Sequence, residues 1–266
     1  MRFSVITPCL NAAPLLPRTL RSVQSQGSDV QHIVVDGGST DGTIDSLHGQ
    51  SIELISEPDR GMYDALAKGL RRATGDWITY LNAGDTLEER AFETVARAAR
   101  TRDIRWLVGR TGMRDESGRL RRATVPFRYR RSLILAGQYC RRPPLYLPFL
   151  QQEGTFWRRE LLDVVDYDAL ASFRLAGDQY LWMRFATLCE PAIVTAPLGI
   201  FHRHAGQLSE NRARYHAEVA SIARPLTIAE ALRGESDALM WHAPLALKKL
   251  LNRDQLLDLS DSNSSK

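Results

Sequence analysis

The first 110 residues alternate between short β-branched apolar runs and segments with leucines at helical spacing. The apolar runs lie at 2–8, 30–36, 52–56 and 77–81, and each has the length and composition of a buried strand. Helical spacing occupies 15–23 and 62–73, and a further helix is expected over 41–47, capped by Ser39 or Thr40. This alternation favours βαβ crossovers and a mostly parallel sheet. We therefore predict a nucleotide-binding α/β half over residues 1–110.

The pattern changes after residue 110 and predicts a mixed second half over 111–210. Helices are expected at 158–164 and 178–188, with a short strand at 193–196. From residue 208 to about 257 the chain is expected to be largely helical, so 211–259 form a C-terminal helical segment. The polar tail at 260–266 has the composition of a disordered end.

Composition excludes several classes of protein. At 266 residues with 44% apolar content, the chain can bury a real core. It contains no apolar run near the ~20 residues that span a bilayer and no signal-peptide layout, so we expect a cytoplasmic protein. The three cysteines are widely spaced without a CxxC pair, so neither a zinc site nor a disulfide framework is indicated, and buried free thiols are expected.

The net charge of +4 is concentrated in an arginine-rich stretch between Arg100 and Arg142. Such a stretch attracts phosphate groups, whether on anionic lipid, a pyrophosphate-linked substrate or nucleic acid. It is equally typical of a solvated face in an arginine-rich protein.

Three carboxylates follow consecutive predicted strands: Asp36, Asp59 and Asp85. Taken singly, each has the sequence setting of a turn residue. Together they would lie at the carboxyl edge of the sheet, where open α/β sheets bind ligands. A nucleotide needs separate acceptors for its base and ribose and a cation for its phosphates, and this set can supply them.

Five segments together resemble the family 2 glycosyltransferases with the GT-A fold, and are closest to the branch that builds bacterial surface polysaccharides of the colanic acid type. They are SVITPCLNA from Ser4, VVDGGSTDGT from Val34, EPDRGMYDALAKG from Glu57, ATGDWITYLNAGD from Ala73 and AGDQYLWMR from Ala176. Their order along the chain makes the resemblance far more specific than any single motif. It implies a GT-A type sheet flanked by helices.

The resemblance implies a set of nucleotide-binding residues. Thr7, Pro8 and Asn11 match the loop that packs on the nucleobase, and Asp36 matches the aspartate that hydrogen-bonds it. Asp59 and Arg60 match the loop beside the uracil or diphosphate. Ser39 and Asp41 are expected to shape their loop instead of touching the donor.

A divalent metal, Mg²⁺ or Mn²⁺, is also implied. Asp85 matches the metal-proximal carboxylate of a DxD-like motif, and Asn82 stands where that motif begins. The stretch is thinned to one firm carboxylate, which is compatible with Mg²⁺ because this ion often takes one or two carboxylates plus phosphate and water. His204 is a candidate third ligand.

On the acceptor side, Asp178 matches the catalytic base of the family's ED motif, although Gly177 replaces the usual glutamate. Without the resemblance, a helix N-cap is the simpler interpretation of an aspartate after glycine. Gln152 and Glu153 match an HQ-type motif near the acceptor, with Gln151 where histidine is usual.

These assignments predict an inverting glycosyltransferase that moves a sugar from a UDP-linked donor to a hydroxyl of a saccharide or polyprenyl-linked acceptor. The alternative is a catalytically weak sugar-nucleotide-binding protein of the same fold. A dehydrogenase is disfavoured because no GxGxxG follows the first strand, and a nucleic-acid partner is not expected. The amphipathic segment 229–257 is compatible with a peripheral membrane contact at the inner face and with packing on the domain or a second subunit. The arginine-rich stretch slightly favours the membrane contact.

Overall fold

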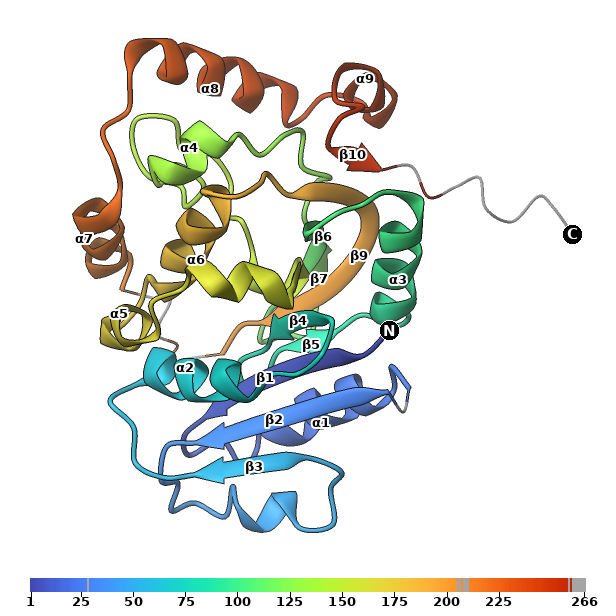
Figure 1. Cartoon of the computed structure of the whole chain (residues 1–266), viewed down its shortest axis with the longest axis vertical. Helices are drawn as coiled ribbons and strands as arrows, with labels where there is room; N and C mark the ends of the chain where they lie inside the picture. The colour runs from blue at the N-terminus through green and yellow to red at the C-terminus, as the bar shows by residue number, and fades with distance from the viewer. Residues whose placement is uncertain (28, 205–206, 208–210, 258, 260–266) are drawn as a thin grey trace, which may run out of the picture.

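A computed structural model describes residues 1–27, 29–204, 207, 211–257 and 259 (Figure 1). Its strands are β1 (Phe3–Cys9), β2 (Val30–Asp36), β3 (Glu53–Ser56), β4 (Trp77–Tyr80), β5 (Thr86–Leu87), β6 (Trp106–Arg114), β7 (Leu120–Arg122), β8 (Thr155–Arg158), β9 (Ala192–His202) and β10 (Leu256–Leu257). Its α-helices are α1 (Leu16–Gln24), α2 (Met62–Arg72), α3 (Ala91–Thr101), α4 (Arg131–Leu135), α5 (Tyr167–Ser172), α6 (Gly177–Ala186), α7 (Arg212–Ile222), α8 (Ile228–Met240) and α9 (Leu245–Leu251). Short 3₁₀ helices are η1 (Asp45–Leu47), η2 (Gln152–Gly154) and η3 (Arg159–Val164).

The strands form one sheet in the order β10-β9-β6-β8-β4-β1-β2-β3. Neighbours along this path are parallel except at β8, which runs antiparallel to both β4 and β6. Two short strands lie off the path, β5 against β9 and β7 against β6. The predicted α/β fold with a mostly parallel sheet is thus confirmed, and the expected strand at 30–36 is observed with the same bounds.

Strands from the second half of the chain complete this sheet. β6 crosses residue 110 and pairs in parallel with β9, which runs for 11 residues where a short strand was expected. β8 inserts between β4 and β6. The two halves therefore share one continuous sheet, and β6 and β8 were not predicted.

Two predicted helices differ from the structure. Over 41–47 the chain forms a loop that ends in η1, because the Asp41 carboxylate accepts from the backbone N–H and hydroxyl of Thr43 and from the N–H of Ala13. These bonds hold the backbone in a turn instead of a helix. The expected helix at 158–164 is the end of β8 followed by η3.

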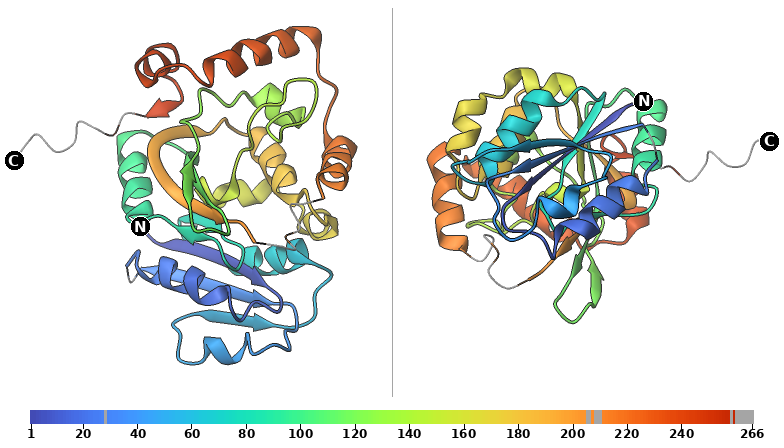
Figure 2. Two further views of the ribbon diagram at one scale, coloured as in Figure 1. Left: turned by 180° about the vertical axis from the view of Figure 1, so that it is seen from behind. Right: turned by 90° about the horizontal axis from the view of Figure 1, so that it is seen from below.

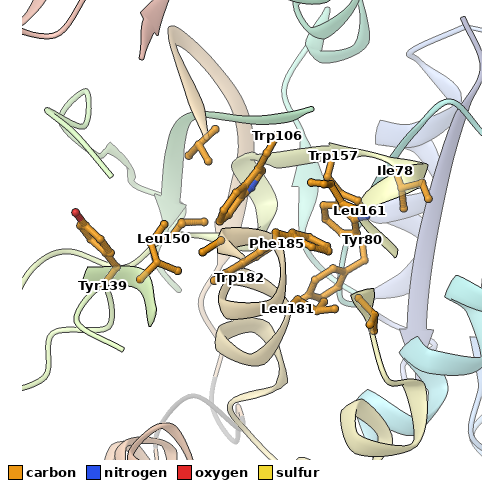
Figure 3. Close-up of a cluster of buried hydrophobic side chains, with 14 of the residues drawn as sticks. Ile78, Tyr80, Trp106, Tyr139, Leu150, Trp157, Leu161, Leu181, Trp182 and Phe185 are labelled. Atoms are coloured by element: carbon orange, nitrogen blue, oxygen red, sulfur yellow. The ribbon is translucent and has the colours of Figure 1, made fainter. Parts of the chain in front are cut away.

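Helices cover both faces of the sheet (Figures 1 and 2). One cluster of buried side chains joins α2 and α6 to the sheet, and another joins α3 to the opposite face. The first cluster contains stacked rings of Trp106 and Trp182, whose centroids are 5.7 Å apart, with Trp157 and Phe185 beside them (Figure 3). Cys9 and Cys140 are buried free thiols as expected, and Cys189 is half-buried.

The C-terminal segment consists of three separate helices. The linkers before α8 and α9 contain Pro225 and Pro244, which interrupt a continuous helix. α8 begins with a capping box in which Thr227 and Glu230 satisfy each other's backbone N–H groups. Within the described part of the chain, no helix has the length and apolar character needed to cross a bilayer. The predicted tail at 260–266 lies outside the described residues.

Candidate active site

Asp85 lies just beyond the carboxyl end of β4 and is tied to the end of β9. Its Oδ1 accepts a hydrogen bond of 2.9 Å from the backbone N–H of His202. The pairing of β5 with β9, Thr86 opposite Ile200, sets this contact. The residue is 3% exposed, so its carboxylate is fixed by the sheet.

Glu153 lies at the same edge, because β8 runs antiparallel to β4 and therefore starts where β4 ends. The side chain is 2% exposed, and Oε2 has no hydrogen-bond partner among the described residues. Its backbone presses on β9: a Cβ on Gly199 would lie 2.0 Å from the Glu153 carbonyl oxygen. Gly199 is thus required for η2 to reach this position.

Asp178 is the second residue of α6 and is half-buried. The N-cap is Ala176, whose side chain makes no capping bond, so the structure does not support the N-cap interpretation of Asp178. Its Oδ1 accepts from the N–H of Gln179 at 2.7 Å, and the hydroxyl of Tyr215 lies 3.0 Å from each carboxylate oxygen. Tyr215 comes from α7 and orients the carboxylate.

A second α7 residue holds the backbone that enters α6. Glu218 accepts hydrogen bonds from the N–H groups of Arg174, Leu175 and Ala176, at 3.2, 2.9 and 3.0 Å. A carboxylate at a helix N-terminus also interacts favourably with the helix dipole. Glu218 therefore caps the backbone at the start of α6, and the Asp178 carboxylate is not needed for that role.

Three carboxyl groups interact electrostatically around this site. Burial, and then the charge of Glu153, raises the pKa of Asp85 well above its ordinary value. Burial, and then the charge of Asp178, raises the pKa of Glu153 to about 7. Burial raises the pKa of Asp178 to about 7 as well, although the bonds from Gln179 and Tyr215 lower it. Glu153 thus links Asp85 to Asp178, and pKa values near neutrality are typical of proton-transfer groups.

A pocket of about 330 Å³ opens beside the Asn82–Asp85 turn. Its lining is mainly cationic or acidic side chains around Gly84: Leu15, Arg18, Arg114, Asp115, Glu116, Gly118, His202, Arg203 and His204. Arg18 Nη1 lies 3.3 Å from Nδ1 of His202. The arginines and histidines supply the N–H donors that a diphosphate needs.

A divalent cation fits part of this arrangement. No group of three or more His, Cys, Asp or Glu within the described ranges is placed to hold a metal. Asp85 and Glu153 are nonetheless two buried, mutually repelling carboxylates, and Oε2 of Glu153 has no partner in the described part of the chain. Two carboxylate oxygens completed by phosphate and water are a usual Mg²⁺ environment. His204 lines the adjacent pocket, which keeps it a predicted ligand.

The expected base-binding residues are mostly covered. Thr7 is fully buried, with Oγ1 2.9 Å from Nε2 of His32, and Pro8 is buried in β1 opposite Val35. Asp36 is also fully buried. These three side chains pack within the sheet and its loops, and their contacts with the base stay predictions.

Hydrogen bonds explain the position of Asp36. Its carboxylate accepts from the N–H groups of Gly38 and Ser39 and from the hydroxyl of Ser56. Burial raises the pKa of Asp36, but these bonds outweigh that effect and lower it overall. In this structure Asp36 stabilises the loop after β2.

Asn11 joins the loops that follow β1 and β2. It is exposed; its side chain accepts from the N–H of Thr40 at 2.9 Å, and its own N–H donates to the Ser39 hydroxyl at 2.7 Å. With the Asp41 bonds described above, this contact agrees with a loop-shaping role for Ser39 and Asp41. Asn11 thus remains the exposed residue of the predicted base-binding loop.

The loop after β3 places Asp59 beside Asp36. A Cβ on Gly37 would lie 2.3 Å from Asp59 Oδ2, so the glycine makes room for the carboxylate. Burial raises the pKa of Asp59. Arg60 is exposed and pairs with Asp64 at 3.0 Å, so in this structure it binds α2 and not the site.

Asn82 lies in the turn that carries Asp85. It is half-buried, and its Oδ1 has no hydrogen-bond partner among the described residues. Its carbonyl oxygen accepts from the N–H of Asp85 at 3.0 Å, which closes the turn. Gln152 is buried in η2 next to Glu153, so neither predicted acceptor residue presents an open surface here.

The residues of the site that were not predicted include Arg18, Tyr215 and Glu218. Arg18 is on α1 and reaches His202 at the end of β9. Tyr215 and Glu218 are three residues apart on α7, so they share one helix face. That spacing was visible in the sequence, but nothing in it indicated that α7 packs against the start of α6.

Comparison with solved structures defines the class of fold. The structure of Staphylococcus aureus TarS 1–349 in complex with UDP-GlcNAc matches 91% of this chain and 72% of its own, with a TM-score of 0.62 and 17% identity. The mannosyltransferase PcManGT from Pyrobaculum calidifontis, in complex with GDP-Man and Mn²⁺, matches 94% of this chain and 78% of its own, with a TM-score of 0.55 and 18% identity. At these identities the likeness shows the fold, which is that of the GT-A glycosyltransferases.

Sequence comparison then gives the family. The family model described as Glycosyl transferase family 2 matches residues 4–164. An uncharacterised glycosyltransferase of Mycobacterium tuberculosis (strain CDC 1551 / Oshkosh) is 31% identical over 205 residues, which are 73% of this chain and 72% of that protein. The chain belongs to glycosyl transferase family 2.

A shorter match is with the PGL/p-HBAD biosynthesis glycosyltransferase of Mycobacterium bovis (strain BCG / Pasteur 1173P2). It is 40% identical over 104 residues, and these cover 36% of this chain and 40% of that relative. The chain thus spans well under two thirds of that relative's length.

Proposed function

We propose that this protein is an inverting glycosyltransferase that moves a sugar from a UDP-linked donor to a hydroxyl of a saccharide or lipid-linked saccharide. The observation that carries the proposal is the carboxylate of Asp178, oriented by Tyr215 and linked through Glu153 to Asp85. In the proposed site, Asp178 would act as the base and the region of Asp85 would bind the diphosphate.

Asp178 acts as the general base. The acceptor oxygen attacks the anomeric carbon from the face opposite the diphosphate, and its proton passes to Asp178 as the new bond forms. The bond between the anomeric carbon and the diphosphate oxygen breaks, and its electron pair leaves with that oxygen. A pKa of about 7 suits this role, because a base is most effective near the operating pH.

The pocket beside Gly84 receives the diphosphate. Arg18 and Arg114 line it and place positive charge where the leaving group gains negative charge. Asp85 and Glu153 would hold Mg²⁺ or Mn²⁺, with Asn82 and His204 as further predicted contacts. Such a cation, when bound, neutralises the leaving diphosphate as a Lewis acid.

The nucleotide lies over the loops that follow β1, β2 and β3. Exposed Asn11 and half-buried Asp59 face the base and ribose, and Asp36 fixes the loop between them. Thr7 and Pro8 pack beneath these loops. Arg60 would have to break its ion pair with Asp64 to reach the donor. The similar structures hold UDP-GlcNAc or GDP-Man, which supports a nucleotide-sugar donor in general.

The acceptor belongs to surface polysaccharide biosynthesis. Gln152 and Glu153 border its path to Asp178, and the mixed half over 111–210 would shape its specificity. We place the reaction at the cytoplasmic face of the membrane, where a polyprenyl-linked acceptor would present its saccharide.

Donor hydrolysis and thermal shift test the proposal together. The purified chain is incubated with UDP-glucose, UDP-GlcNAc or GDP-mannose, each with and without Mn²⁺, and free nucleotide is measured. We expect a UDP sugar with Mn²⁺ to give turnover and the largest rise in Tm. Asp178→Asn should lower turnover by about 10²- to 10⁴-fold and keep the shift. Asp85→Asn should remove the part of the shift that depends on Mn²⁺.

The rival function is sugar-nucleotide binding without effective catalysis. It is favoured by the single firm carboxylate at 82–85 and by Gly177 before Asp178. A donor-dependent rise in Tm without turnover for any donor would support this rival. Equal shifts with and without Mn²⁺ would count against the metal site and leave the donor assignment standing.

A further inference from the structure

Helix α8 exposes an apolar stripe. Ile228, Leu232 and Leu239 are 83%, 63% and 82% exposed, and their spacing of four and seven residues places them on one helix face. The opposite face is packed: a Cβ on Gly234 would lie 2.2 Å from Cδ1 of Leu145, and Asp237 is buried in an ion pair with Arg130. The stripe therefore points away from the domain.

Helix α9 buries a lysine and exposes leucines. Lys248 is 3% exposed, and its ammonium group donates to the carbonyl oxygens of Val125 and Trp241. Four leucines of the same helix are exposed: Leu245, Leu247, Leu250 and Leu251. A helix that faces only water would show the opposite arrangement.

These side chains form what we call the α8–α9 face: Ile228, Leu232, Leu239, Leu245, Leu247, Leu250 and Leu251. They are seven of the thirteen large apolar side chains that are exposed among the described residues, so the exposed apolar surface is concentrated on two neighbouring helices. Figure 1 shows both helices at the end of the molecule opposite β2 and β3. Concentrated apolar surface of this kind marks an interaction site.

Cationic side chains border the α8–α9 face. Arg128 donates to the carbonyl oxygen of Leu251, and Arg102 donates to that of Arg253, so three arginines gather at the end of α9. Arg233 is exposed on α8. Among the described residues, the exposed acids of this region are Asp254 and Glu235, whereas Glu230 and Asp237 are paired with Arg224 and Arg130. Glu235 lies within the stripe, three residues after Leu232 and four before Leu239, so the stripe carries one acidic side chain. The border therefore carries net positive charge.

We infer that the α8–α9 face docks on an anionic membrane surface, with its leucines in the acyl boundary and its arginines against lipid phosphates. Aliphatic side chains bordered by arginine are the composition that binds such surfaces. In a two-fold contact between copies, each patch faces its own equivalent, so the cationic borders would be brought together. That repulsion disfavours a second copy as the occupant.

Vesicle binding tests the inference. The full chain is mixed with vesicles of phosphatidylcholine alone or with about 30% phosphatidylglycerol, and the bound fraction is measured by flotation. We expect binding to the anionic vesicles that weakens with salt. The double variant L232Q/L239Q should reduce the partition coefficient at least tenfold, and R233Q/R253Q should reduce it on anionic vesicles only. The control is Leu54→Gln, since Leu54 is an exposed leucine on β3 at the far edge of the sheet, and it should bind as the wild type does.

Two outcomes would overturn the inference. One is equal binding by wild type and L232Q/L239Q. The other is no vesicle binding by a wild-type chain that sediments as a dimer and becomes a monomer in L232Q/L239Q, which would assign the face to a second copy. The inference deepens the proposed lipid-linked acceptor, but the assay contains neither donor nor acceptor. Failure of binding is therefore distinct from failure of donor hydrolysis, which both double variants should retain.

Discussion

The hydroxyl of Tyr215 lies 3.0 Å from both carboxylate oxygens of Asp178. Burial raises the pKa of the Asp178 carboxyl group to about 7. The Tyr215 hydroxyl opposes this effect, because it donates a hydrogen bond to the charged form of the carboxylate. α7 thus supplies the contact that keeps this proposed base usable near neutral pH. The same helix supplies Glu218, so one element both orients the carboxylate and caps the approach to its helix.

The first prediction concerns Tyr215→Phe. Loss of a hydrogen bond to the charged form should raise the pKa of Asp178 further, by about one unit for a bond worth roughly 1.5 kcal/mol. The acid limb of kcat/KM against pH should move upward, and the rate at pH 7 should fall several-fold with KM for the donor unchanged. Tyr146→Phe is the control because Tyr146 is exposed. An unchanged acid limb in Tyr215→Phe would contradict the positioning role.

The second prediction is that Asp178→Asn stabilises the protein at pH 8 while abolishing most activity. The folded-state pKa of Asp178 is raised to about 7, so the native state binds the proton more tightly than the unfolded chain does. Its contribution is fully present below the unfolded pKa near 4 and is lost as pH rises through about 7. Removing the charge should therefore recover roughly 1 to 3 kcal/mol at pH 8.

Urea unfolding at pH 4 and pH 8 measures this effect. The gain of Asp178→Asn over wild type should be small at pH 4 and larger at pH 8. Asp103→Asn, at an exposed position, should show no such difference. A gain that is the same at both pH values would mean that ionisation of Asp178 is not its cause.

The third prediction is that Glu218→Ala destabilises the entry to α6. Three N–H groups lose their acceptor, and the loss of hydrogen bonds to a charged group should cost about 1.5 to 3 kcal/mol. Glu218→Gln keeps an acceptor and should recover part of the stability. Urea unfolding compares both with Glu235→Ala, an exposed glutamate on α8; equal losses at 218 and 235 would remove the capping role.

The fourth prediction concerns Gly199→Ala. The new Cβ would lie 2.0 Å from the Glu153 carbonyl oxygen, so η2 or β9 must shift. We expect the free energy of unfolding to fall by more than about 2 kcal/mol. We also expect a lower rate of sugar transfer, because the shift would displace Glu153 relative to Asp85. Gly27→Ala separates this clash from backbone strain, since Gly27 has a φ of +119° and nothing within 4 Å of its added Cβ. Gly199 is not among the glycines with positive φ, so a loss of less than about 1 kcal/mol in Gly199→Ala would argue against the close contact.

The sequence predicted β1 to β4, α1 and α2 of the first half of the fold, but not α3, β5 or β6. The local pattern of apolar residues predicts β1, β2, β4 and α2, because the side chains that each element buries lie within one short stretch of sequence. The strand-end position of Asp85 follows from the same pattern. The helix expected at 41–47 was wrong because Asp41 bonds to the backbone around it, a competition that periodicity does not record.

The site needed contacts between distant segments. β8 enters the sheet antiparallel to β4 and brings Glu153 to Asp85, and α7 brings Tyr215 to Asp178. The sequence by itself determined which carboxylates were available and that a mostly parallel sheet would carry Asp85 at its edge. Only the tertiary structure decided which of them are buried, which are paired and what orients Asp178, because the partners Tyr215 of Asp178 and His202 of Asp85 lie 37 and 117 residues away along the chain.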